Sequence, residues 1–396
     1  MLTLAKYIKL AALLLGCLIL SGSGNQRGTI DFWHVLNSKA NVSQSYWHFS
    51  SYFTAHLEQL PDSMLVKLAR LSIPLAQYIY SLRLLEGDHL NTAKIYWGSA
   101  VSELPNEHRE VLAQHLLARS RWGDLAFLND NNFLPEGATK EYLKLELGVN
   151  HNKVSSAFVS ELGFASLGDD IKPKPHCLFN VLTMSNHRSG LNKLDELIAI
   201  YNQTPEPHKN VFCFSKPVYV AGAVQCGLNE NQAARCEMQT IAHTNLSFDD
   251  FDFKIMMPRH GTANVTNDTM HINSTATYPV FLHELMHFNG FEDEYVLPQA
   301  KQAWLCTQRG YVAPNLYISD DGHRPKGWHK AKSCQKGGVA YKPSENWSIM
   351  EYQQLGLSDQ YRALWLNHLD IVKADLKRAP RGATSINIGV KSEQIK

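Results

Sequence analysis

The chain has 396 residues, of which 44% are hydrophobic, 10% aromatic and 19% charged. This composition is typical of a globular protein, and the length is large for one domain and comfortable for two. The formal net charge is +1, so the charge balance gives no indication of nucleic acid as a partner.

Residues 1–24 predict a secretory signal peptide. Lys6 and Lys9 precede the apolar run LAALLLGCLIL at 10–20, and the small residues SGSG follow it. This run is too short to span a membrane comfortably. We therefore expect an exported protein, either periplasmic or extracellular. Cys17 also fits a bacterial lipoprotein cleavage box loosely, and its lipidation is the alternative that would anchor the protein to a membrane.

Residues 25–170 predict a helical domain. Apolar residues recur at helical spacing in 76–104 and 110–128, and Gly-Asp pairs at Gly87 and Gly123 interrupt the two segments. The pairs lie 36 residues apart (123 − 87), near the period of tetratricopeptide-type repeats, but most signature residues of those repeats are missing. The pattern is consistent with a repeat array and equally with an irregular helical domain. Either could recruit a substrate or partner protein, or pack against the rest of the chain.

The sequence pattern changes at residues 168–176, GDDIKPKPH, whose two prolines and mixed charge predict a linker. We expect a second domain over residues 171–396, in which strands alternate with helices. An amphipathic helix is expected at 188–203, and strands are expected at 176–184, 210–224, 251–258 and 267–275. The predicted fold class is therefore α+β, with an all-α domain followed by a mixed sheet and its helices.

Six cysteines follow residue 170, and an even number in an exported chain favours disulfide bonds. None shows CxxC spacing, so a cysteine-bound zinc ion is not expected. Proximity in the sequence suggests the pairs Cys226–Cys236 and Cys306–Cys334, which leaves Cys177–Cys213 among the many pairings that six cysteines allow.

The stretch HELMHFNGFEDEY, which begins at His283, predicts a metal site. His283 and His287 are four residues apart on an expected helix, so both imidazoles lie on one face and can reach one ion. Gly290 is expected to end this helix, because glycine adopts the left-handed conformation at little steric cost. The chain can then turn and bring Asp293 back to the ion as a third ligand. Three protein ligands with one open position are typical of catalytic zinc.

Glu284 is expected to act as a base rather than as a ligand. It follows the first histidine on the same helix, so it can take a proton from a water molecule that the metal activates and pass it to a leaving amine. Thr277 is expected to cap this helix.

Glu292 and Glu294 flank Asp293, and either could replace it as the third ligand. If Asp293 is the third ligand, we expect Glu292 and Glu294 to be solvated surface charges or to contact the ligands without binding the metal.

The pattern HExxHxxGxxD resembles the metzincin metalloproteases, whose motif usually ends in His and in some members in Asp. The DEY ending at 293–295 is also similar to bacterial metallopeptidases of the IgA-peptidase-like group. Further along the chain, SIMEY at 348–352 resembles the methionine turn of the astacin type. This resemblance implies that Met350 lies beneath the metal and that the phenol of Tyr352 stabilises the oxyanion. It also implies that the strand at 267–275 can pair with extended substrate.

The resemblance implies an exported zinc endopeptidase that acts on polypeptides, with Zn²⁺ held by His283, His287 and Asp293. Glu284 would be the general base, and Gly290 and Met350 would shape the site. One alternative is an amidase that acts on cell-wall peptides at the same zinc site. Another is a helical binding protein with an inactive protease domain. The presence of Glu284 argues against the second alternative, because an inactive site has no need of a base.

Overall fold

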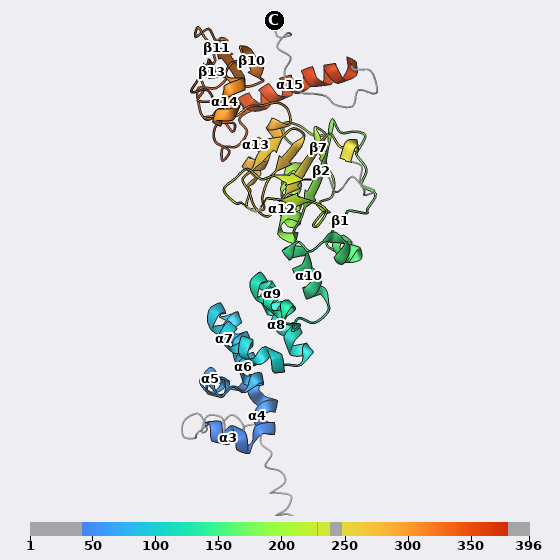
Figure 1. Cartoon of the computed structure of the whole chain (residues 1–396), viewed down its shortest axis with the longest axis vertical. Helices are drawn as coiled ribbons and strands as arrows, with labels where there is room; N and C mark the ends of the chain where they lie inside the picture. The colour runs from blue at the N-terminus through green and yellow to red at the C-terminus, as the bar shows by residue number, and fades with distance from the viewer. Residues whose placement is uncertain (1–41, 228, 238–247, 379–396) are drawn as a thin grey trace, which may run out of the picture. The chain divides into compact units, whose positions relative to one another are not determined.

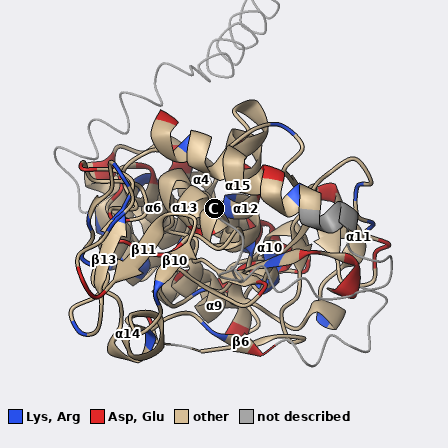
Figure 2. Ribbon diagram, turned by 90° about the horizontal axis from the view of Figure 1, so that it is seen from above, with Lys and Arg blue, Asp and Glu red and all other residues tan. Residues whose placement is uncertain are grey.

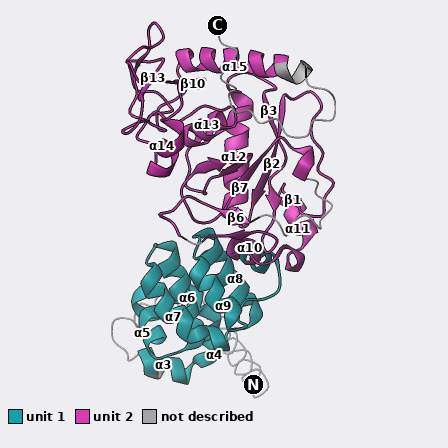
Figure 3. Ribbon diagram, turned by 45° about the horizontal axis from the view of Figure 1, so that its top comes forward, with its two compact units in different colours: residues 1–143 teal, residues 144–396 magenta. Residues whose placement is uncertain are grey.

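The structure is a computed structural model that describes residues 42–227, 229–237 and 248–378 (Figure 1). The predicted signal peptide and Cys17 lie outside these residues. Basic and acidic residues are interspersed along the ribbon (Figure 2). The chain divides into two compact units, residues 1–143 and 144–396, coloured teal and magenta in Figure 3. No helix in the described ranges is long and apolar enough to cross a membrane.

The described part of the first unit consists of helices around one apolar core. Trp97, Leu65 and Leu116 are fully buried in this core. The helices are α3 (Val42–His48), α4 (Ser50–His56), α5 (Asp62–Arg70), α6 (Pro74–Glu86), α7 (Leu90–Ala100), α8 (Asn106–Ala118) and α9 (Trp122–Asp130), with 3-10 turns at Leu57–Gln59 and Val101–Glu103.

One of the two predicted helix breaks is in the expected place. After α6, Asp88 has a φ of 57°, and α7 follows. The second predicted break is wrong, because Gly123 lies inside α9 and the turn is at Ser120, which has a φ of 53°. Within α9, Asp124 is buried and accepts a hydrogen bond from Arg121 Nε at 2.7 Å. The 36-residue spacing of the Gly-Asp pairs therefore does not mark a repeated turn.

The division between the units lies between Leu143 and Lys144, earlier than the boundary expected near residue 170. Helix α10 (Ala138–Leu147) crosses the division, and α11 (Ser156–Glu161) and strand β1 (Ala165–Ser166) belong to the second unit. β1 pairs in parallel with β4 (Val218–Tyr219). The hydroxyl of Tyr219 also donates a hydrogen bond to the carbonyl of Val149. Helices thus continue in the sequence beyond the core of the first unit, but α11 and β1 already belong to the unit that contains the sheet.

The second unit contains a mixed sheet with the strand order β1-β4-β2-β7-β9-β8, in which β3 also pairs with β2. Its pairs are parallel except for β8 with β9. The remaining strands are β2 (Phe179–Ser185), β3 (Phe212–Phe214), β7 (Phe253–Met257), β8 (Asn264–Thr266) and β9 (Thr269–His271). A mixed sheet with helices agrees with the α+β class expected from the sequence.

Alternate residues of the central strands are buried on opposite faces of the sheet. Val181 of β2 and Ile255 of β7 join a core with helices α12 (Arg188–Gln203), α13 (Tyr278–His287) and α15 (Asp359–Arg378). Leu182 and Met256 belong to a second core with Val218. Because both faces are covered, the sheet provides a fixed base for α13.

The prediction that segment 267–275 offers its own edge to a substrate is wrong. Only residues 269–271 of it form a strand, β9, which lies between β7 and β8. A turn at Asn267, with a φ of 55°, folds β8 back onto β9 as an antiparallel hairpin. β8 therefore occupies the edge that the sequence assigned to this segment.

A smaller antiparallel sheet follows the metal motif in the sequence. Its strands are β10 (Gly310–Ala313), β11 (Leu316–Ser319), β12 (His329–Lys330) and β13 (Val339–Lys342), in the order β10-β11-β13-β12. Helix α14 (Gln299–Leu305) precedes them, and Leu305 shares a core with Ile318 of β11.

The structure contains the three predicted disulfide bonds, Cys177–Cys213, Cys226–Cys236 and Cys306–Cys334. The second bond joins the strands of a short hairpin, β5 (Gln225–Cys226) and β6 (Cys236–Glu237). Disulfide bonds persist in oxidising compartments, so these three bonds indicate an exported protein.

Candidate metal centre

Helix α13 carries the first part of the metal motif. Thr277 is the N-cap residue as predicted, but its side chain makes no capping hydrogen bond, and a proline occupies the first turn. The helix ends at His287, and Gly290 has a φ of 74°, the left-handed conformation expected of it. Phe281 and Leu285 are fully buried in the core against the sheet. The position of the two histidines is therefore set by a packed helix.

The structure brings the three predicted ligands together. Nε2 of His283 and Nε2 of His287 are 3.1 Å apart, and each lies 3.2 Å from Oδ1 of Asp293. These three atoms form a group that could hold a metal ion. Ligands that lie roughly 2.0–2.1 Å from a tetrahedral zinc ion are about 3.3 Å from one another. The observed spacing therefore fits one ion of this size.

Two backbone carbonyls fix the orientation of the imidazole rings. Nδ1 of His283 is 2.9 Å from the carbonyl oxygen of Ile349, and Nδ1 of His287 is 2.7 Å from that of Phe291. A carbonyl oxygen only accepts hydrogen bonds, so each Nδ1 must carry a proton and donate it. In the neutral ring, Nε2 then presents its lone pair to the centre of the group, as a metal ligand must.

The electrostatics of the group also favour a cation. Oδ1 of Asp293 is buried and makes no hydrogen bond within the described chain. Burial lowers the pKa of His287, but the Asp293 carboxylate outweighs it and raises this pKa to about 9. Burial alone would raise the pKa of Asp293, yet His287 and His283 hold it well below its ordinary value. A buried carboxylate oxygen without a hydrogen bond is costly unless a positive charge lies beside it.

Glu284 is buried next to this group but is not one of its three members. Only 2% of its surface is exposed, and Oε2 has no hydrogen-bond partner in the described part of the chain. Burial raises the pKa of Glu284, and the nearby His287 and His283 oppose this effect. A carboxylate with a raised pKa and a free oxygen is suited to accept a proton.

The two carboxylates beside Asp293 point to other partners. Glu292 forms an ion pair of 2.5 Å with Lys301. Glu294 is fully buried and accepts hydrogen bonds from Ser348 and from two other side chains. Asp293, rather than either neighbour, is thus the carboxylate that lies with the histidines. The sequence left Glu294 either as a surface group or as a group around the ligands, and its full burial excludes the first.

The SIMEY segment lies against the ligands, but its tyrosine has other contacts. Met350 is fully buried, and its carbonyl accepts a hydrogen bond of 2.9 Å from the backbone of Glu294. Tyr352 is 38% exposed, and its ring centre lies 4.5 Å from that of Trp347 and 5.8 Å from Nζ of Lys332. The Tyr352 ring therefore packs beside Trp347 and Lys332.

Sequence reasoning missed a second tyrosine, Tyr295. Burial raises the pKa of Tyr295, and the nearby Asp293 carboxylate raises it further. The available signal was the spacing, because Tyr295 follows the third ligand by two residues. The charge of a predicted ligand therefore acts on this phenol.

A second group of possible metal donors consists of His176, Cys177 and Cys213. The two cysteines are bonded to each other, so neither offers a thiolate to a metal.

No protein-family model matches the chain, and no curated protein matches its sequence. The functional assignment therefore depends on the geometry of the site.

Proposed function

We propose that the protein is an exported metal-dependent peptidase of the metzincin type and that its metal is Zn²⁺. The main support is the convergence of two imidazole Nε2 atoms and one carboxylate oxygen at 3.1–3.2 Å. Both rings are fixed by backbone carbonyls in the tautomer that a metal requires. Two nitrogens and one carboxylate oxygen are a ligand set of catalytic zinc in hydrolases.

His283, His287 and Asp293 would hold the ion and leave one position open. A bound Zn²⁺ supplies Lewis acidity, which polarises a peptide carbonyl and lowers the pKa of water. Glu284 takes the proton of the attacking water molecule and delivers it to the leaving amine nitrogen. Its raised pKa suits both steps, because the same carboxyl group must first accept and then donate a proton.

Two tyrosines are candidates to stabilise the negative charge that develops on the carbonyl oxygen. The SIMEY resemblance suggests Tyr352, whereas the Asp293 carboxylate raises the pKa of Tyr295, which makes Tyr295 the second candidate. The variants Tyr352→Phe and Tyr295→Phe separate the two roles. Loss of a phenol that acts only in the transition state lowers kcat and leaves KM unchanged.

The proposed activity can be tested with the purified chain on casein and on peptides from bacterial cell wall. We expect about one zinc ion per chain and cleavage of casein, with loss of activity in a chelator and recovery when Zn²⁺ is restored. Cleavage of cell-wall peptides but not casein would support the amidase alternative. A zinc-loaded protein that cleaves neither substrate would contradict the proposal and support a helical binding protein with an inactive protease domain.

A further inference from the structure

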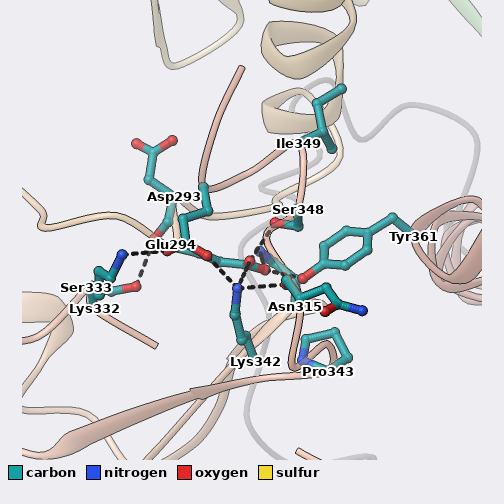
Figure 4. A network of polar contacts seen from close by, with 12 residues as sticks. Asp293, Glu294, Asn315, Lys332, Ser333, Lys342, Pro343, Ser348, Ile349 and Tyr361 are labelled. Atoms are coloured by element: carbon teal, nitrogen blue, oxygen red, sulfur yellow. Dashed lines mark hydrogen bonds and ion pairs between the residues drawn. The ribbon is translucent and has the colours of Figure 1, made fainter. Parts of the chain in front are cut away.

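The buried carboxylate of Glu294 is surrounded by hydrogen-bond donors (Figure 4). Its Oε1 accepts from the Tyr361 hydroxyl at 2.5 Å and from Nδ2 of Asn315 at 2.8 Å. Its Oε2 accepts from Oγ of Ser348 at 2.5 Å and lies 3.6 Å from Nζ of Lys342. None of the Glu294 surface is exposed to solvent.

We propose that Glu294 is a positioning residue that sets the geometry of the metal-binding group without binding the metal. The inference rests on the proposed function, because it concerns the same metal centre. It assigns a role to the one carboxylate of the motif that is buried away from the ligands.

The first connection is to Asp293, its neighbour in the chain. The Asp293 side chain points away from the network, whereas that of Glu294 points into it (Figure 4). The backbone is held on both sides of this pair. Oγ of Ser333 donates to the Asp293 carbonyl at 2.8 Å, and the backbone amide of Lys332 donates to the Glu294 carbonyl at 3.2 Å. With the Glu294 side chain anchored as well, the Asp293 carboxylate has little freedom to turn away from the histidines.

The second connection is to His283 through the SIMEY segment. Ser348, which donates to Glu294, immediately precedes Ile349, whose carbonyl oxygen accepts from Nδ1 of His283. The backbone amide of Glu294 also donates to the carbonyl of Met350, at 2.9 Å. One carboxylate therefore fixes the third ligand and also the carbonyl that orients the first. Groups that orient metal ligands in this way tune metal affinity.

The third connection is to elements remote in the sequence. Tyr361 belongs to α15, and Asn315 lies between β10 and β11. Oδ1 of Asn315 also accepts from the backbone amide of Glu292 at 2.9 Å, and its Nδ2 donates to the Glu292 carbonyl at 2.7 Å. The ligand segment is thus held to a helix and to the small sheet at one point.

Ion pairs that extend from the buried Lys342 to the exposed Lys332 balance the charges of the network. Lys342 is 4% exposed, and its Nζ forms an ion pair of 2.5 Å with Glu351. Glu351 also pairs with Lys332 at 2.9 Å. Two carboxylates and two ammonium groups therefore compensate one another. An apolar side chain could fill the position of Glu294, but it could not accept from Ser348, Tyr361 and Asn315 together.

The test compares Glu294→Gln with wild type and with Glu206→Gln as a matched control. Glu206 binds Arg362 of α15 through two contacts of 2.8 Å, so this control loses a charged contact of the same helix. Zn²⁺ affinity is measured by competition with a chromophoric chelator, and the visible absorption spectrum of the Co²⁺-substituted protein reports ligand geometry. For Glu294→Gln we expect a ten- to hundredfold fall in affinity, on the order of losses at ligand-orienting partners, and an altered Co²⁺ spectrum. The control should match wild type in both.

Wild-type affinity and an unchanged Co²⁺ spectrum in Glu294→Gln would overturn the inference, even if the variant unfolds at a lower temperature. If Glu294→Gln does not fold, Ser348→Ala provides the test, because it removes one donor and leaves the carboxylate in place. Its affinity should also fall and its Co²⁺ spectrum should change; wild-type values would overturn the inference. Metal binding does not depend on hydrolysis, so a chain that binds zinc and cleaves no peptide would contradict the proposed function alone.

Discussion

Metal binding should compete with a proton on His287. Burial lowers the pKa of this imidazole, but the Asp293 carboxylate raises it to about 9 in the metal-free protein. The metal binds only the neutral ring. At pH 7 about one molecule in a hundred has the neutral ring, so the apparent metal affinity is about a hundredfold below its value above pH 9, or about 2.7 kcal/mol.

The sign of the pH dependence follows from this competition. The raised pKa means that the metal-free protein retains the His287 proton up to about pH 9, so affinity rises as pH rises toward that value and levels off above it. The expected slope from this histidine is about tenfold per pH unit between pH 6.5 and 8.5.

Isothermal titration calorimetry with Zn²⁺ measures the released proton directly, when the titration is repeated at pH 7 in buffers of different ionisation enthalpy. We expect about one proton from His287 per metal ion bound. In the control Asp293→Asn, the carboxylate that raises the pKa is absent, so the release from His287 should decrease. A flat affinity profile from pH 6.5 to 8.5 with no proton release would refute the coupling between His287 and Asp293.

Three further predictions concern stability, measured as the free energy of unfolding in urea. Met350→Ala should lower it by about 2–5 kcal/mol because Met350 is fully buried, whereas Met350→Leu should cost less than about 1.5 kcal/mol; equal values for the two variants would contradict this packing. Burial lowers the pKa of His187 to about 3 and of His271 to about 4. Both are therefore neutral in the folded state and gain protons on unfolding below pH 6.5. As the pH is lowered below 6.5, the free energy of unfolding should decrease by up to about 1.4 kcal/mol per pH unit for each histidine. His271→Gln should reduce that slope, and an unchanged slope would exclude this histidine as a cause. Replacing Cys306 and Cys334 by serine removes a disulfide bond of sequence separation 28 and should lower the free energy of unfolding by about 3–4 kcal/mol. An unchanged free energy of unfolding after reduction of the wild type would contradict this.

Local patterns predicted the elements that carry the site. The spacing of His283 and His287 and the glycine at 290 were sufficient for the helix and its end, because periodicity and left-handed glycine act over a few residues. The disulfide pairs were also found from sequence proximity, which favours short loops. The proposed role of Met350 depends on a second segment, SIMEY, which is far from the histidines in the sequence.

Features set by distant packing were not predicted. Glu294 has the sequence context of a surface charge, yet donors from Asn315, Ser348 and Tyr361 converge on it only in the folded chain. The turn at Ser120 was assigned to a nearby glycine, because glycine is the stronger local signal for a turn. The division after Leu143 lies before the linker expected at 168–176, because helical periodicity does not show which core a helix joins.

The proposed function requires that Glu284 acts on a substrate at a metal centre that it does not help to form. The most direct measurement is the zinc content and casein hydrolysis of Glu284→Gln beside wild type. We predict that the variant keeps about one zinc ion per chain and loses hydrolysis by at least about a hundredfold, the lower range for a general base. Zinc retention with wild-type hydrolysis would contradict the account.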